Sequence, residues 1–301
     1  MKYIFFGTPE FSAIILEKLI DSSLFPVALV CNPDRPIGRK MIVTPPPTKE
    51  VVLRKSLLEI DVLQPEKINE EFLNKLGSYE ADFYIVAAYA KILPAELLNI
   101  PKLGIIGVHP SLLPKLRGSS PIQSAILEGD TQTGVTLYLL DEKVDHGPIL
   151  AKRELEFPVS PSTPSSGPRG NFQFPILSQK LAELAANLLV KTLPKFVKGE
   201  ITPLLQNESK ATFTKKFTTE DGYINIDELK NAINGLNTKT AEIIDRKIRA
   251  LNPEPGVYTI IHGKRMKILN AHLENNKLIF GEIQFEGKKP TLFSQYQSLL
   301  S

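Results

Sequence analysis

Residues 104–121 read GIIGVHPSLLPKLRGSSP and form the most informative stretch of the chain. The apolar run Gly104–Val108 predicts a buried strand, and His109 follows directly at its carboxyl end. A proline-rich turn and the expected start of a helix come next. In an open α/β sheet, ligands bind at the carboxyl ends of the strands, and a histidine there can exchange a proton near neutral pH. The stretch therefore predicts a candidate site at this edge of a sheet.

Short apolar runs alternate with helical patterns in the first half of the chain, which is typical of βαβ units. The expected strands are Lys2–Phe6, Pro26–Cys31, Phe83–Ala88, Gly104–His109, Gly134–Leu140 and Ile149–Phe157. Thr8 and Pro9 are expected to begin the first helix, with Thr8 as its N-cap. We expect an α/β fold with a Rossmann-like, mostly parallel sheet.

The second half predicts a smaller domain. Residues 158–175 are rich in Pro, Ser and Gly and predict a mobile surface loop, and Leu177–Val197 predicts a long amphipathic helix. Short expected elements follow: helices Asp227–Gly235 and Thr240–Arg249, then strands Gly256–His262, Met266–Asn270 and Lys277–Ile283. That order suggests a C-terminal OB-like β-barrel. The expected domains are 1–198 and 215–301, joined by a linker at 199–214.

The composition excludes several classes of protein. The 301 residues are 42% apolar and 23% charged, with a net charge of +3, as in an ordinary globular protein. No apolar run approaches the ~18 residues that a membrane helix needs. One cysteine, Cys31, permits no internal disulfide, and no Cys/His cluster has metal-ligand spacing. The dinucleotide motif G-x-G-x-x-G is absent. We expect a cytoplasmic monomer without membrane or metal.

The stretch from His109 to Pro121, together with residues 145–149 (DHGPI), resembles the signature of the folate-dependent formyltransferases, most closely of those that act on methionyl-tRNA. The resemblance implies transfer of a formyl group from 10-formyltetrahydrofolate to the amino group of methionyl-initiator tRNA, for translation initiation. His109 would then accept the proton of the attacking amine and donate to the oxyanion that forms. Asp145 would orient the ring and stabilise its protonated form.

Position 107 departs from this pattern. The family usually has Asn two residues before the histidine, and this chain has Gly107. Loss of one oxyanion donor typically costs about 10²–10³ in rate. A water or another side chain could replace the amide, because glycine leaves room for either. Other functions stay open: formylation of another amine such as an amino-sugar nucleotide, hydrolysis of formyltetrahydrofolate, or a weakly active or non-catalytic homologue.

Two segments suggest where the folate would bind. Residues 88–94 (AYAKILP) resemble the family's loop after the third strand, whose backbone usually holds the pterin. The expected folate contacts are Tyr89, Ile92, Leu93, Pro94, Ser111, Leu112, Leu113 and Pro114. For Leu112 and Leu113, packing in the core is an equally good interpretation.

Basic residues suggest where tRNA would bind. Residues 31–40 (CNPDRPIGRK) look like the family's tRNA-contacting loop, and the segment from Cys31 to Lys55 holds six basic and two acidic residues. Positive charge on mobile loops suits phosphate backbones, although a charge run is usually only a solvated face. Residues 246–256 resemble a second family motif. The expected tRNA contacts are Arg35, Arg39, Lys40, Lys247 and Arg249.

Overall fold

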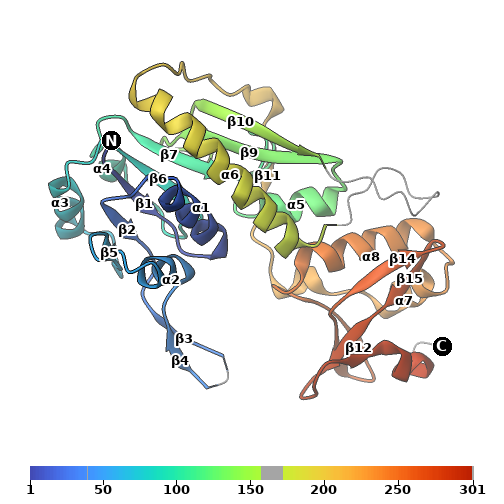
Figure 1. Cartoon of the computed structure of the whole chain (residues 1–301). Helices are drawn as coiled ribbons and strands as arrows, with labels where there is room; N and C mark the ends of the chain where they lie inside the picture. Colours follow the sequence, from blue (N-terminus) through green and yellow to red (C-terminus); the bar gives the residue numbers. More distant parts are fainter. Residues whose placement is uncertain (39, 157–171, 300–301) are drawn as a thin grey trace. The chain divides into compact units, whose positions relative to one another are not determined.

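The computed structural model describes residues 1–38, 40–156 and 172–299, and the chain divides into two compact units (Figure 1). The first unit comprises Met1–Gly118, Gly134–Leu155 and Ser178–Phe213. The second unit comprises Ser119–Thr133, Glu156–Leu177 and Thr214–Ser301.

A seven-stranded sheet in the order β10-β9-β7-β6-β1-β2-β5 forms the centre of the first unit within the described residues. Its strands are β1 (Tyr3–Phe6), β2 (Ala28–Val30), β5 (Asp61–Leu63), β6 (Phe83–Ala87), β7 (Ile105–His109), β9 (Gln132–Leu139) and β10 (Ile149–Glu156). Strands β7, β6, β1, β2 and β5 run parallel, so the mostly parallel sheet is confirmed. Strand β9 runs antiparallel to β7.

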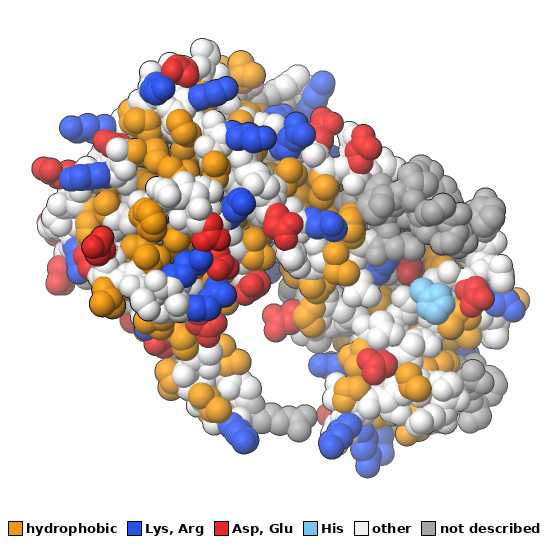
Figure 2. Space-filling model, in the orientation of Figure 1, with side chains coloured by type: hydrophobic (Ala, Val, Ile, Leu, Met, Phe, Trp, Pro, Cys, Tyr) orange, Lys and Arg blue, Asp and Glu red, His pale blue; other side chains and the backbone are white. Residues whose placement is uncertain are grey.

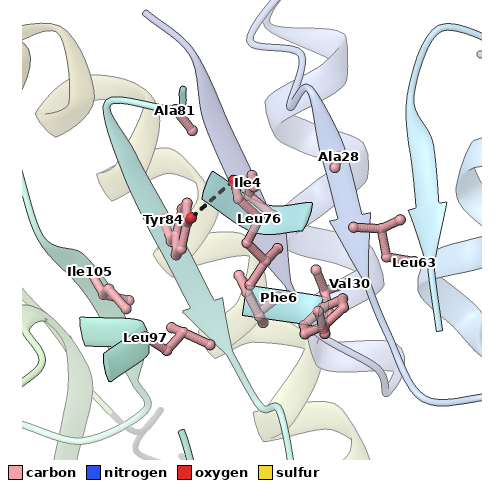
Figure 3. Packing of buried hydrophobic residues seen from close by; sticks show 11 residues of the cluster. Ile4, Phe6, Ala28, Val30, Leu63, Leu76, Ala81, Tyr84, Leu97 and Ile105 are labelled. Atoms are coloured by element: carbon pink, nitrogen blue, oxygen red, sulfur yellow. Dashed lines mark hydrogen bonds between the residues drawn. The ribbon is translucent and has the colours of Figure 1, made fainter. Parts of the chain in front are cut away.

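Helices cover both faces of this sheet. They are α1 (Glu10–Asp21), α2 (Pro47–Arg54), α3 (Glu70–Ser78), α4 (Ala95–Leu98) and α6 (Phe174–Val197). Successive strand residues point to opposite faces, so both faces of a central parallel strand must be apolar. On one face, Ile4 and Phe6 of β1 join a buried cluster with Leu76 of α3 and Leu97 of α4 (Figure 3).

The opposite face carries an aromatic stack. Tyr3 stacks on Phe83 of β6 at 5.5 Å between ring centroids, and Phe83 meets Phe196 of α6 edge-on at 5.7 Å. Figure 1 shows α6 crossing this sheet. Strand β6 is thus packed on both faces, and the buried strand β7 beside it ends at His109.

Several local expectations are wrong or incomplete. Thr8 does not cap α1: Pro9 takes the N-cap position without a side-chain bond, and Thr8 Oγ1 accepts the Asn32 N–H at 3.2 Å instead. The sequence also does not predict β5 or the hairpin of β3 (Arg35–Ile37) and β4 (Ile42–Thr44). Three-residue strands are too short to show a hydrophobic period.

The second unit combines helices with antiparallel strands. Its elements are α5 (Pro121–Glu128), η2 (Thr219–Gly222), α7 (Ile226–Ile233), α8 (Thr238–Leu251), β12 (Val257–Ile261), β13 (Lys264–Ile268), β14 (Ala271–Glu274), β15 (Lys277–Phe280), β16 (Glu282–Phe285), β17 (Thr291–Leu292) and η3 (Phe293–Leu299). Strands β12, β13, β16 and β17 form one sheet, and β14 pairs with β15. The small antiparallel domain is confirmed, and the expected strand Lys277–Ile283 is divided between β15 and β16.

The segment expected as a linker, 199–214, is bonded to the first unit. Leu204 and Ile149 exchange both backbone hydrogen bonds, at 2.7 and 2.9 Å. The short strands β8 (Arg117–Gly118) and β11 (Phe213–Thr214) pair with each other, and η1 (Glu208–Lys210) lies between these contacts in the sequence. The segment therefore does more than join two domains, because it also forms part of the structure around β7.

Most of the expected loop 158–175 lies outside the described residues. Its last residues are described, and α6 already begins at Phe174, three residues before the expected start. None of the helices that the structure describes is long and apolar enough to cross a membrane.

Leu76 offers a test of the core beneath the sheet. Its side chain is fully buried, whereas Leu53 of α2 is 58% exposed. We expect Leu76→Ala to lower the free energy of unfolding by about 2–5 kcal/mol, because it removes buried methyl groups and leaves a cavity. Urea unfolding followed by circular dichroism measures this, with Leu53→Ala as the matched control. Equal losses for both variants would contradict the assigned core.

Candidate functional site

The site is built on the pairing between β7 and β9. In this antiparallel register His109 lies opposite Thr136, and Gly107 lies opposite Tyr138. Residues two apart on a strand point to the same face. The four positions therefore share one face, at the end of the sheet where β7 stops.

Asp145 reaches His109 by a route that the sequence does not predict. Because β9 is antiparallel, its last residue Leu139 lies beside Ile106, away from His109. The loop after β9 turns back, and Asp145 takes a left-handed φ of 49° within it. Gly147 permits the return, since a Cβ there would lie 1.8 Å from the Leu139 carbonyl oxygen. The result places Asp145 Oδ2 3.5 Å from His109 Nδ1.

Both oxygens of the Asp145 carboxylate have donors. Tyr138 donates its hydroxyl to Oδ1 at 2.5 Å, and the Gly118 N–H donates to Oδ2 at 2.7 Å. Burial raises the pKa of Tyr138 well above its ordinary value, and the Asp145 charge adds to this. Tyr138 therefore stays a donor at neutral pH. The carboxylate is fixed with one oxygen toward the histidine.

His109 is only 5% exposed and is held on both sides of its ring. Its Nε2 lies 2.8 Å from the Leu116 carbonyl oxygen. Because a carbonyl can only accept, we assign a hydrogen to Nε2, which leaves Nδ1 facing the Asp145 carboxylate. A substrate that uses Nε2 must replace the Leu116 contact.

Thr136 fixes the loop that follows His109. Its hydroxyl donates to the Ser111 carbonyl at 2.7 Å and accepts the Leu113 N–H at 3.0 Å. Ser111 is 1% exposed and Leu113 is fully buried, so their side chains pack inside the protein rather than lining a folate surface. Of the expected contacts in this loop, Leu112 and Pro114 remain half-exposed.

The next residues of the loop are anchored by the segment after α6. Arg117 is 2% exposed and binds both carboxylate oxygens of Glu208, at 2.6 and 3.0 Å. These bonds hold the pKa of Glu208 below its ordinary value. Gln206 accepts from the Arg117 guanidinium and donates to the Asp145 and Gly147 carbonyls at 2.9 and 2.8 Å. One segment thus supports both loops of the site.

The loops after β6 and β2 each contain a polar atom without a protein partner. The Tyr89 hydroxyl and Asn32 Oδ1 are buried and unpaired, at the carboxyl ends of β6 and β2. The Tyr89 ring meets Phe6 edge-on at 5.5 Å, and burial raises its pKa to about 12. Ile92 is 93% exposed, and Leu93 and Pro94 are half-buried. Buried groups without partners suit a ligand rich in hydrogen-bonding atoms.

Several of the described basic residues between Cys31 and Lys55 form close ion pairs within the chain. The pairs are Lys49–Asp34 at 2.8 Å, Arg54–Glu17 at 2.9 Å and Lys55–Asp21 at 2.6 Å. Arg35 and Lys40 are exposed on the β3–β4 hairpin, and Arg35 has a long 3.9 Å contact to Glu66. Arg39 lies outside the described residues.

The hairpin also exposes apolar side chains. Ile37, Met41, Ile42 and Val43 are 60–66% exposed. Figure 2 shows hydrophobic side chains along this projecting part of the first unit. The surface therefore combines positive charge with exposed apolar residues.

The two cations expected to contact tRNA from the second unit are held by internal contacts. Arg249 is only 8% exposed and forms an ion pair with Asp245 at 2.9 Å, which corrects its expected place on the surface. Lys247 is half-buried and donates to the Tyr223 carbonyl at 2.6 Å. Burial lowers its pKa.

The sequence reasoning missed Thr136, Tyr138 and Gln206. A signal was present for the first two, because they are hydrogen-bonding residues two apart in the otherwise apolar segment 134–140. Such residues need buried hydrogen-bond partners and often support a site. Gln206 lies in a polar stretch with no comparable signal. Across residues 1–38, 40–156 and 172–299, no group of three or more His, Cys, Asp and Glu could hold a metal.

Comparisons with known proteins identify two family domains in the chain. The formyl transferase family model matches residues 1–166, and the formyl transferase C-terminal domain matches residues 216–295. A protein from Bacillus licheniformis, named methionyl-tRNA formyltransferase, is 40% identical over 271 residues, which cover 90% of this chain and 78% of the relative.

Solved structures share the fold. A methionyl-tRNA formyltransferase from Clostridium thermocellum has a TM-score of 0.59 at 15% identity, covering 95% of this chain and 99% of that one. An N-formyltransferase from Helicobacter canadensis, in complex with folinic acid and dTDP-3-aminofucose, has a TM-score of 0.59 at 19% identity, covering 91% and 88%. At such identities the likeness shows the fold alone. With the two family matches and the 40% identity, the chain belongs to the formyl transferase family.

Proposed function

We propose that this protein transfers the formyl group of 10-formyltetrahydrofolate to the amino group of methionyl-initiator tRNA. The observation that carries the proposal is the buried His109–Asp145 pair at the carboxyl end of β7. The curated relative at 40% identity bears the name of this activity. The match of both family domains supports the same assignment.

The chemistry needs a proton acceptor and a stabilised oxyanion. As a primary amine attacks the formyl carbon, negative charge develops on the formyl oxygen and the nitrogen must lose a proton. When the substrate displaces the Leu116 carbonyl, the ring carries its hydrogen on Nδ1 beside Asp145, and Nε2 takes the proton of the amine. The protonated ring then donates to the oxyanion. As the intermediate collapses, the bond between the formyl carbon and N10 of the folate breaks, and the proton on Nε2 passes to N10, which leaves as tetrahydrofolate. Asp145 holds the ring in place and stabilises its positive charge. These two side chains supply both needs of the reaction.

The folate donor is proposed to bind between the loop after β6 and the loop after β7. The proposed contacts are Tyr89, Ile92, Leu93, Pro94, Leu112 and Pro114, each of which is half-buried or exposed. The unpaired Tyr89 hydroxyl fits a ring with many hydrogen-bonding atoms. Ser111 and Leu113 are left out of this set, because both residues are buried and the Ser111 carbonyl and the Leu113 N–H are bonded to Thr136.

The hairpin of β3 and β4 is the proposed tRNA contact. Arg35 and Lys40 supply charge for the phosphate backbone, and the apolar side chains around them suit contact with unstacked bases at an acceptor end. Arg39 belongs to the same proposal by its place in the sequence. All residues of the candidate catalytic site come from one chain, so a monomer suffices. An enzyme of translation initiation would work in the cytoplasm.

The first test asks whether the purified protein formylates the expected acceptor. We expect formyl-methionine on charged initiator tRNA after incubation with 10-formyltetrahydrofolate, measured by mass spectrometry of the aminoacyl group. An amino-sugar nucleotide serves as the competing acceptor. A product on the sugar alone would reject the tRNA assignment.

His109→Ala should lower kcat by about 10²–10⁴, because it removes the general base. Asp145→Asn keeps the shape but not the charge, and we expect a loss in the same range. Single-turnover formylation measures both variants. His272→Ala, at an exposed position on β14, is the matched control. Near-normal turnover by His109→Ala would remove this residue from the mechanism.

Replacing Arg35 and Lys40 by Ala should raise KM for tRNA and leave KM for folate unchanged. For each interaction with a phosphate that the substitutions remove, the slope of log affinity against log salt should fall by about 1. Measurements of tRNA binding between low and moderate salt give that slope. Lys18→Ala, exposed on α1, controls for net charge. A slope equal to wild type would mean that the hairpin does not bind phosphates.

A further inference from the structure

Tyr138 occupies the space that a side chain at position 107 would need. The two residues are direct cross-strand partners. A Cβ added at Gly107 would lie 2.4 Å from Tyr138 Cε1, 2.5 Å from Tyr138 Cζ and 2.5 Å from Leu140 Cδ1. Real Cβ atoms do not approach other atoms so closely. An asparagine at position 107 is therefore incompatible with the tyrosine ring in this position.

The same ring carries the donor that holds Asp145. The Tyr138 hydroxyl is bonded to Oδ1 at 2.5 Å, and Cζ, to which it is attached, is one of the atoms that a Cβ at position 107 would overlap. The ring is 6% exposed and packs with Leu113 and Ile149. Its aromatic body is thus fixed by packing, and its polar end points at the carboxylate beside His109.

We propose that Tyr138 is a positioning residue of the formyl-transfer site, and that Gly107 and Tyr138 together replace the asparagine that the family usually has at position 107. Tyr138 fixes the Asp145 carboxylate against His109, so the protonated histidine carries the oxyanion without a neighbouring amide. This inference rests on the proposed function, because it concerns the same reaction. It predicts that glycine at this position is compatible with activity.

Tyr138→Phe removes the hydroxyl and keeps the ring, so it tests the hydrogen bond to Asp145 separately from the packing. The phenyl group keeps the packing, so the melting temperature should stay within a few degrees of wild type. We expect kcat to fall about 10-fold to 100-fold, since the variant removes a bond from a buried donor to a carboxylate, while KM for both substrates is unchanged. Tyr84→Phe is the matched control, because Tyr84 is a buried tyrosine of the core cluster.

Gly107→Asn tests the steric half of the proposal. Because the new side chain meets the Tyr138 ring, we expect a loss of about 2–10 °C in melting temperature and at least a 10-fold loss of kcat. Adding Tyr138→Val, which removes the ring, should recover part of the melting temperature and part of kcat. Differential scanning fluorimetry and steady-state kinetics on the four proteins of this cycle give the coupling between the two positions.

The outcomes separate this inference from the proposed function. Three results would overturn the inference and leave the proposed function standing. They are a wild-type kcat for Tyr138→Phe, a Gly107→Asn variant more active than wild type, and a double variant no better than Gly107→Asn. If wild type formylates only the amino-sugar nucleotide, the tRNA assignment fails and the same cycle is read with that acceptor. If wild type formylates neither acceptor, both proposals are contradicted.

Discussion

The antiparallel register between β7 and β9 is the constraint on which the site depends. It sets His109 against Thr136 and Gly107 against Tyr138 on one face. A shift of β9 by one residue would turn Thr136 and Tyr138 to the other face of the sheet, away from His109 and Gly107. From this register, Thr136 fixes the loop after β7 and Tyr138 fixes the loop after β9.

A carboxylate in such a place is costly unless it is paired. The Asp145 side chain is 15% exposed, so it has lost much of its water. Donors from Tyr138 and Gly118 offset that cost and leave the charge facing His109. The groups that keep the folded carboxylate stable are therefore those that prepare the site for chemistry.

Much of this organisation can be predicted from the sequence, and the reasons for the failures are physical. Apolar runs locate six strands of the sheet because central strands are buried on both faces. The motifs around His109 and Asp145 identify the family. The direction of β9 could not be predicted, because an apolar period carries no information on direction. Burial of Arg249 and Leu113 and the role of Gln206 depend on contacts between residues far apart in the sequence.

The polar segment that follows α6 limits how short a catalytic fragment of this chain can be. Gln206 and Glu208 hold the carbonyls of the Asp145 loop and the guanidinium of Arg117, and Leu204 pairs with Ile149. A fragment cut where α6 ends would keep every residue of the catalytic motifs and lose their support. A cut after Phe213 would keep these contacts, but it would leave Ser119–Thr133 of the second unit in the fragment without the helices that follow Thr214. The two units are therefore not separable at a single point of the chain.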